Sequence, residues 1–256
     1  MSIRLGIRQQ GISLISLMVG QVVSLLVILA MLGLFRAVSR NVFDPDTGMQ
    51  PRAIQDRQVG SALLTAQSML QSAGFGIPSP SVNTHFILVN GVVVSGAGGT
   101  STLQTAGAML EPIGSTSAIG NAIFWESNPS QSSSTAAWSC QGLASNQATG
   151  ALYSLQAAGG CDLLSTTWAA QQWTITRLVA DIQLPTPITF AVAGTHNSPC
   201  WPYGAEVPSS TLATQIGAEN GISSASQNTA GLQIQLNWGT KTGFGSWLSC
   251  LPNFTS

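Results

Sequence analysis

The chain has 256 residues, of which eight are Lys or Arg and nine are Asp or Glu. A chain of this length would ordinarily carry about 64 charged side chains. The low charge, together with 44% hydrophobic residues, argues against a disordered protein, which needs high charge and low hydrophobicity. Beyond residue 58 the chain has two basic and six acidic residues, so direct binding of nucleic acid is not expected, because that requires several Lys and Arg.

One stretch is apolar for long enough to cross a membrane. Residues 12–35 contain no charged side chain, and as a helix they would be about 36 Å long, against about 30 Å for a hydrocarbon core. Three interpretations fit this stretch: a cleaved secretory signal, a plain membrane anchor, or an anchor that also serves in assembly. It is longer than the apolar region of an ordinary secretory signal.

The residues before this stretch favour the third interpretation. A leader with Arg4 and Arg8 ends at Gly11, and the hydrophobic Ile12 follows at once. The pattern resembles the class III signal of type IV pilins and pseudopilins. In that family a prepilin peptidase cleaves after the glycine and methylates the new N-terminus, so the resemblance implies processing between Gly11 and Ile12.

One position departs from that family. The fifth residue after the cleavage site is usually Glu, which is thought to pair with the N-terminal amine of a neighbouring subunit, and here it is Ser16. A carboxylate within hydrocarbon is costly unless it is paired, and Ser cannot form the ion pair. Either Ser is tolerated at this position, or the subunit lies at a filament tip, where no subunit beyond it needs the pair.

A break and a second helix are expected next. Residues 41–52 contain two prolines and a glycine, which should interrupt a helix. Apolar residues then recur at spacings of three and four, which predicts an amphipathic helix over 53–75, ended by Gly74, Gly76 and Pro78. Its apolar stripe consists of Ile54, Val59, Leu63, Ala66, Leu70 and Ala73.

Residues 76–256 predict a β-rich domain. The segment 86–94 predicts a hairpin with a two-residue turn at Asn90 and Gly91. Further strands are expected at 122–125, 152–155, 173–184, 188–193 and 232–238, separated by Gly, Pro, Asn and Ser clusters. The expected fold class is α+β, with an antiparallel sheet whose apolar face packs on the 53–75 helix.

All four cysteines lie in the β-rich part. They have no C-x-x-C spacing, so zinc and redox sites are not favoured. An even number of cysteines after an export segment indicates two disulfides. Three connectivities are possible, and we favour the sequential one, which joins Cys140 to Cys161 and Cys200 to Cys250.

No catalytic site, metal site or cofactor is predicted. The two histidines, His85 and His196, belong to no metal-binding motif, and neither a nucleophile elbow nor a Walker loop is present. Four carboxylates could in principle pair as the acid and base of a glycosidase, although structural roles are favoured. These are Glu111, Glu126, Asp162 and Asp181.

Several segments are similar to PilW-type minor pilins. They are residues 63–76, the expected strand at 121–126, the Ser-Cys-Gln-Gly sequence at 139–142, and residues 178–182. The resemblance implies a pilin-like fold in which a long N-terminal helix packs on an antiparallel sheet. It also implies a leader at 1–11, a transmembrane and filament-core helix at 12–40, a break at 41–52, a helix at 53–75 and a globular domain at 76–256.

The function implied by this resemblance is that of a minor pilin that helps to start or prime pilus assembly near the filament tip. Its partners would be other minor and major pilins, the prepilin peptidase and the inner-membrane assembly platform. Before assembly the chain would span the bacterial inner membrane once with its C-terminal domain in the periplasm, and afterwards it would lie in the surface pilus. Alternatives are a GspJ-like pseudopilin of type II secretion and a membrane-tethered extracytoplasmic domain that binds a ligand or hydrolyses a glycan.

Overall fold

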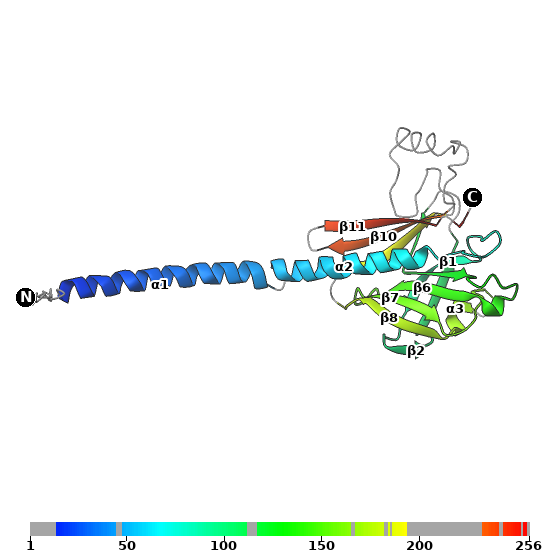
Figure 1. The fold of residues 1–256 in the computed structure, drawn as a ribbon, viewed down its shortest axis with the longest axis horizontal. Coiled ribbons are helices and arrows are strands. Elements are labelled where there is room, and N and C mark those ends of the chain that lie inside the picture. The colour runs from blue at the N-terminus through cyan, green and yellow to red at the C-terminus, as the bar shows by residue number, and fades with distance from the viewer. Residues whose placement is uncertain are drawn as a thin grey trace, which may run out of the picture. The chain divides into compact units, whose positions relative to one another are not determined.

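The computed structural model describes residues 14–44, 48–111, 117–164, 167–181, 184, 186–193, 232–240, 243–251 and 253–254. The chain divides into two compact units, Met1–Ala53 and Ile54–Ser256 (Figure 1). The first unit contains the long helix α1, and the second contains most of helix α2 and all the strands. The fold class is therefore α+β, as the sequence predicts.

Helix α1 (Leu14–Phe43) extends a little beyond the expected 12–40 segment, and α2 (Met49–Leu70) begins before the expected residue 53. The break between them is therefore narrower than predicted. Pro51 lies in the first turn of α2, where a backbone N–H has no helical acceptor, so proline is tolerated there. Two hydrogen bonds of helical spacing lie at the break: Asp44 N–H donates to the Arg40 carbonyl, and Gly48 N–H donates to the Asp44 carbonyl.

The predicted apolar stripe of α2 forms much of the domain core. Val59, Leu63, Ala66 and Leu70 are buried, and so is Ala73 in the turn that follows. The prediction for Ile54 is wrong, because its side chain is 45% exposed. Two polar members of the same face, Gln55 and Gln67, are also buried, and Gln67 accepts a hydrogen bond from the indole of Trp247 at 3.1 Å.

The strands form two antiparallel sheets. The larger sheet has the order β2-β8-β7-β6-β5-β1-β3, and the smaller has the order β11-β10-β9-β4. The bounds in the larger sheet are β1 Phe86–Val93, β2 Gly99–Ser101, β3 Thr105–Leu110, β5 Ala122–Ser127, β6 Ser139–Ser145, β7 Leu152–Ala157 and β8 Trp173–Val179. Those in the smaller sheet are β4 Ser117–Gly120, β9 Thr186–Ala193, β10 Leu232–Thr240 and β11 Gly243–Leu251, and short helices occur at Thr135–Ala137 (η1) and Thr167–Ala170 (α3).

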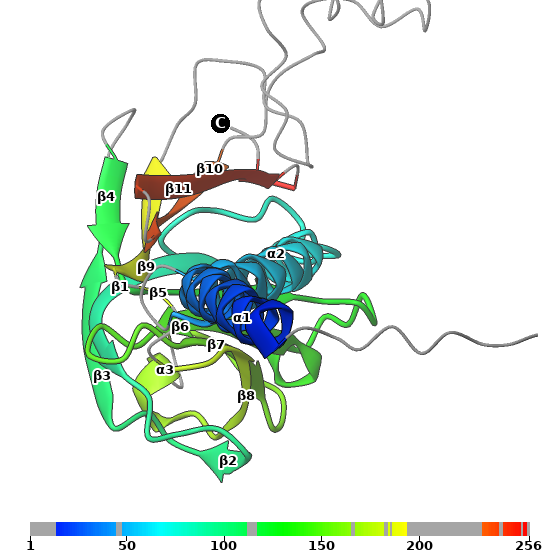
Figure 2. The ribbon, with the colours of Figure 1, turned by 90° about the vertical axis from the view of Figure 1, so that its left-hand side faces the viewer.

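The larger sheet curls until its two edges approach each other. Its edge strands, β2 and β3, are consecutive in the chain and are joined by residues 102–104 alone. Such a link spans at most about 14 Å, whereas seven flat strands would extend about 29 Å from edge to edge. The sheet is therefore a nearly closed barrel, and Figure 2 shows its strands curving round α3.

The hairpin predicted at Asn90 and Gly91 is wrong. Both residues lie inside the single strand β1, which pairs with β5 over its first half and with β3 along most of its length. Gly91 lies opposite Gly107 of β3, and both have positive φ, at 83° and 70°. Because a Cβ on Gly107 would meet the backbone of β1, this glycine pair bends the two strands instead of reversing the chain.

The curled sheet is buried on both faces. One face, with Phe86, Leu88 and Trp125, packs with α2 and the smaller sheet. The other face, with Phe124 and Trp173, encloses a second core inside the barrel. The prediction of one sheet with one apolar face on the helix is therefore incomplete, because β1 and β5 have apolar side chains in both alternating positions.

Most strands predicted from apolar runs are present. The expected strands at 122–125, 152–155, 188–193 and 232–238 correspond to β5, β7, β9 and β10. The strand expected at 173–184 ends at Val179. In β10 the apolar Leu232, Ile234 and Leu236 are buried and alternate with Gln233 and Gln235, as predicted for a half-buried strand.

Candidate functional site

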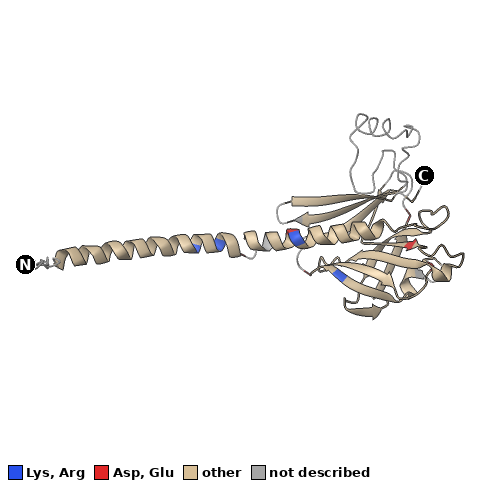
Figure 3. Cartoon of the chain, in the orientation of Figure 1, with Lys and Arg blue, Asp and Glu red and all other residues tan. Residues whose placement is uncertain are grey.

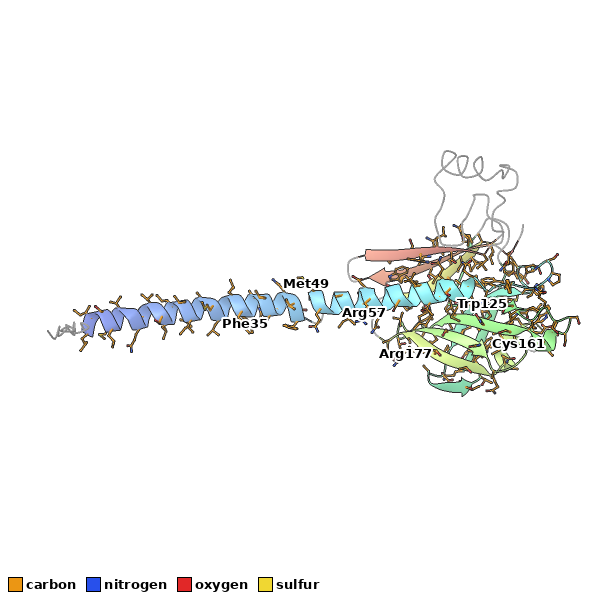
Figure 4. The ribbon with its side chains drawn as sticks, in the orientation of Figure 1. Phe35, Met49, Arg57, Trp125, Cys161 and Arg177 are labelled. Carbon is orange, nitrogen blue, oxygen red and sulfur yellow. A yellow bond between two sulfur atoms is a disulfide. The ribbon has the colours of Figure 1, made fainter. Side chains whose placement is uncertain are left out.

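The surface of α1 is the most distinctive feature of the first unit. Its large apolar side chains are exposed, except that Val42 is half-buried, and they project from every side of the helix (Figure 4). By length and composition α1 is the one helix in the described part of the chain that could cross a membrane. A helix that is apolar all round needs an apolar environment, either lipid or other helices.

Ser16, the position of the usual assembly glutamate, lies exposed on α1. Gly11 and Ile12, the predicted processing residues, lie outside the described residues. The next polar positions along the helix are Gln21 and Ser24, and the Ser24 hydroxyl donates to the Gly20 carbonyl at 2.8 Å. Ser24 therefore satisfies its own donor within the helix, which lowers its cost in hydrocarbon.

The disulfide predicted between Cys140 and Cys161 is present, with its Cα atoms 5.9 Å apart. Both cysteines are buried in the barrel core, and Cys161 is labelled in Figure 4. The bridge ties strand β6 to the segment that follows β7. Cys250, on β11, is also disulfide-bonded, and Cys200 lies outside the described residues.

A buried carboxyl group lies beside this bridge. Glu126 is opposite Cys140 in the β5–β6 pairing, and its Oε1 accepts a hydrogen bond from Leu163 N–H at 2.5 Å. Burial raises the pKa of Glu126 from 4.5 to about 7; the Leu163 hydrogen bond opposes this rise and the negative charge of Asp162 adds to it. Glu126 is 2% exposed, so its carboxyl group holds the segment after Cys161 in place and does not face solvent.

The other charged groups of the second unit are sparse (Figure 3). Arg177 and Asp181 form an exposed ion pair at 3.4 Å, and Glu111 is exposed directly after strand β3. Of the four carboxylates considered as a glycosidase pair, the structure brings Glu126 and Asp162 into electrostatic contact. Within the described residues no group of three or more His, Cys, Asp and Glu side chains is arranged to hold a metal ion.

A groove of about 560 Å³ lies at the end of the domain where α2 terminates. Residues 76–78, from the turn after α2, form part of its lining, and residues after β5 form the rest. Sequence analysis missed this groove because its members are ordinary loop residues, and only the fold brings the two loops together. It is lined by Gly76, Ile77, Pro78, Asn128, Gln131, Ser132, Ser133 and Trp138.

Two neighbouring groups stabilise Trp138 in this groove. Its indole N–H donates to the Ser132 carbonyl at 3.2 Å, and the ring of His85 lies 5.8 Å away, tilted by 42°. The Nδ1 atom of His85 accepts a hydrogen bond from Ser81 N–H at 3.1 Å, and burial lowers the pKa of His85. At neutral pH His85 is therefore an uncharged packing partner of Trp138.

Comparison of the chain with models of known protein families, with curated proteins and with solved structures gave no significant match.

Proposed function

We propose that this protein is a minor subunit of a type IV pilus, of the PilW-like kind, that helps to start or prime filament assembly. The observation that carries the proposal is the helix α1, which is exposed and free of charge over residues 14–35 and follows a basic leader that ends at Gly11. A plain membrane anchor would not need the glycine before the apolar run. A subunit that is released from lipid into a helical bundle needs this glycine, because the prepilin peptidase cleaves after it.

The proposed mechanism has two steps. Cleavage after Gly11 frees the amine of Ile12, and α1 then leaves the bilayer for a core made of similar helices. Both environments are apolar, so the transfer has little hydrophobic driving force, and packing between helices decides it. Residues 14–35 of α1 suit this exchange, because they carry no charged side chain that would have to be moved within hydrocarbon, and Arg36 and Arg40 lie at the C-terminal end of the helix.

The disulfide-bridged domain supports an extracytoplasmic location for the second unit. Disulfides persist in oxidising compartments and are rare in the cytosol. The Cys140–Cys161 bridge is buried beside Glu126, where it contributes to a domain whose sequence has few charged residues. We therefore place this domain in the periplasm before assembly and on the filament surface afterwards.

Co-expression of the full chain with a prepilin peptidase tests the proposal. Mass spectrometry of the mature N-terminus should find N-methylated Ile12, and Gly11→Ala should abolish processing because the peptidase needs the glycine. Ser39→Leu is a control, since a large residue there blocks the site that an ordinary signal peptidase would use and should leave processing at Gly11 unchanged. An intact N-terminus, or one that begins at Arg40, would contradict the proposal and favour a plain anchor or a secretory signal.

The type II secretion pseudopilin shares the processing step, so cleavage does not separate it from a pilus subunit. The two are distinguished by deleting the gene and scoring surface pili and protein secretion separately. We expect loss of pili with secretion intact.

A further inference from the structure

The groove beside Trp138 has a polar but uncharged lining. None of its eight lining residues is ionisable, and they combine an aromatic ring and two apolar side chains with amides and hydroxyls. Phe75, which precedes Gly76 in the chain, adds a half-exposed ring to the same turn. A shallow site of this kind offers flat apolar surface and neutral hydrogen-bonding groups, but no charge for an ionic ligand.

The groove is already formed by hydrogen bonds within the protein. Asn128 is buried, and its side chain donates to the carbonyls of Gly76 and Ser132 at 3.3 and 2.9 Å and accepts from Ser132 N–H at 2.9 Å. Its backbone N–H donates to the Phe75 carbonyl at 2.7 Å. Because Asn128 ties both loops together, a ligand would not have to order the site, which lowers the entropic cost of binding.

The two loops approach so closely that Gly76 is required between them. Gly76 has φ of 71°, and a Cβ there would collide with the Asn128 carbonyl. The two loops that line the groove are therefore fixed relative to each other.

Two polar side chains in this rigid frame have no internal partner. Gln131 and Ser133 are exposed, and within the described residues neither side chain has a hydrogen-bond partner. Gln131 has φ of 51°, a conformation that its backbone N–H stabilises by donating to the Asn128 carbonyl at 3.0 Å. These groups supply three donor hydrogens and two acceptor oxygens beside the fixed ring of Trp138.

We infer that this groove binds an uncharged oligosaccharide. A sugar ring has an apolar C–H face that packs on an indole and hydroxyls at its edge that match amide and hydroxyl groups. A charged ligand would lose hydration without gaining a partner here. No carboxylate lines the groove, and the carboxyl group of the buried Glu126 accepts a hydrogen bond from Leu163 N–H. The site is therefore suited to binding and not to hydrolysis. The inference does not depend on filament assembly.

Fluorine NMR of the full chain tests this inference. The protein, labelled with 5-fluorotryptophan and held in phospholipid nanodiscs free of glycosidic detergent, should give seven signals, one for each Trp. The signal lost in Trp138→Phe identifies Trp138. Titration with maltotriose, cellotriose and chitotriose should shift this signal saturably for at least one sugar, with no change when salt is raised, because no charge is involved.

Matched variants separate specific binding from general stickiness. Gln131→Ala should weaken binding about fivefold, the effect of one lost hydrogen bond, whereas Gln235→Ala, an exposed glutamine on β10, should leave it unchanged. The inference is overturned if none of the three sugars shifts Trp138, if all tryptophan signals move together, or if the two glutamine variants bind equally. Binding of a peptide with no response to any sugar would also overturn it.

Discussion

Glu126 and Leu163 are joined by a hydrogen bond of 2.5 Å from the Leu163 backbone N–H to the Glu126 carboxyl group, in a place from which water is largely excluded. This contact connects the central strand β5 with the segment that follows Cys161. It makes the stability of the domain depend on the protonation of one side chain.

The first prediction concerns pH. The pKa of Glu126 is raised from 4.5 to about 7, so between these values the folded protein keeps a proton that the unfolded chain has lost. The contribution of Glu126 to stability should therefore be fully present below pH 4.5. The free energy of unfolding should fall by about 2 to 3 kcal/mol as the pH rises from 4.5 through 7. Urea unfolding at a series of pH values measures this slope.

Glu126→Gln removes the ionisation and retains an oxygen that can accept from Leu163 N–H. We expect this variant to show a flatter profile over the same range. The exposed Glu111→Gln variant is the control and should keep the wild-type slope. If Glu126→Gln has the same slope as wild type, another group causes the dependence.

The second prediction concerns the Cys140–Cys161 bridge. It closes a loop with a sequence separation of 21, so replacing both cysteines with Ala should lower the free energy of unfolding by about 3 kcal/mol. Thermal unfolding with and without the bridge measures this change. Before reduction, alkylation should modify no cysteine in the native or the denatured protein, and modification of Cys140 in oxidised protein would contradict the assignment.

The third prediction concerns the packing of α2. Leu70 is completely buried and Leu64, on the same helix, is 62% exposed. Leu70→Ala should destabilise the domain by about 2 to 5 kcal/mol, because it leaves a cavity, whereas Leu64→Ala should change stability by about 0.5 kcal/mol or less. Equal effects in denaturant titrations would show that this face of α2 does not pack as described.

The fourth prediction compares two glycines. Gly76→Ala should cost well over about 1 kcal/mol, because Gly76 has positive φ and a Cβ would meet the Asn128 carbonyl. Gly60 lies within α2, and a Cβ added there would have open space around it, so Gly60→Ala should stabilise by about 0.5 to 1 kcal/mol. The opposite signs can be read from melting temperatures, and two changes of the same sign would be inconsistent with this geometry.

The fifth prediction concerns Ser16 on α1. If the subunit lies at a filament tip, no neighbour needs the ion pair, so Ser16→Glu should not increase the number of pili. Ser16→Ala, which also lacks a carboxylate, should behave like wild type. Counting surface filaments in a deletion strain that expresses each variant gives the result, and a clear gain with Ser16→Glu would argue against the tip position.

Sequence periodicity predicted those elements that have one buried face. The spacing of Val59, Leu63 and Leu70 predicted the buried side of α2, and the alternation in β10 predicted a half-buried strand. It did not predict β2, β3, β4, β6 or β11, which are short, exposed or rich in Gly, Ala and Ser. It also misplaced Asn90 and Gly91, since a turn and a strand bend both use a glycine with positive φ, and only pairing with β3 distinguishes them.

The groove shows a similar limit. Ile77 and Trp138 are far apart in the chain, and their side chains line one site because Asn128 fastens two loops together. The cysteines, in contrast, carried enough information from their number and position to predict the first bridge, because few pairings were possible.

The short link between β2 and β3 also sets the order in which the domain can fold. Strand β2 pairs with β8, so Gly99 has no partner until Ile175 is available. The strands β1, β3, β5, β6 and β7 can pair before that point, and both Cys140 and Cys161 precede β8 in the chain. Oxidation of this bridge does not require closure of the barrel, and we expect the long-range β2–β8 pairing to form late in folding.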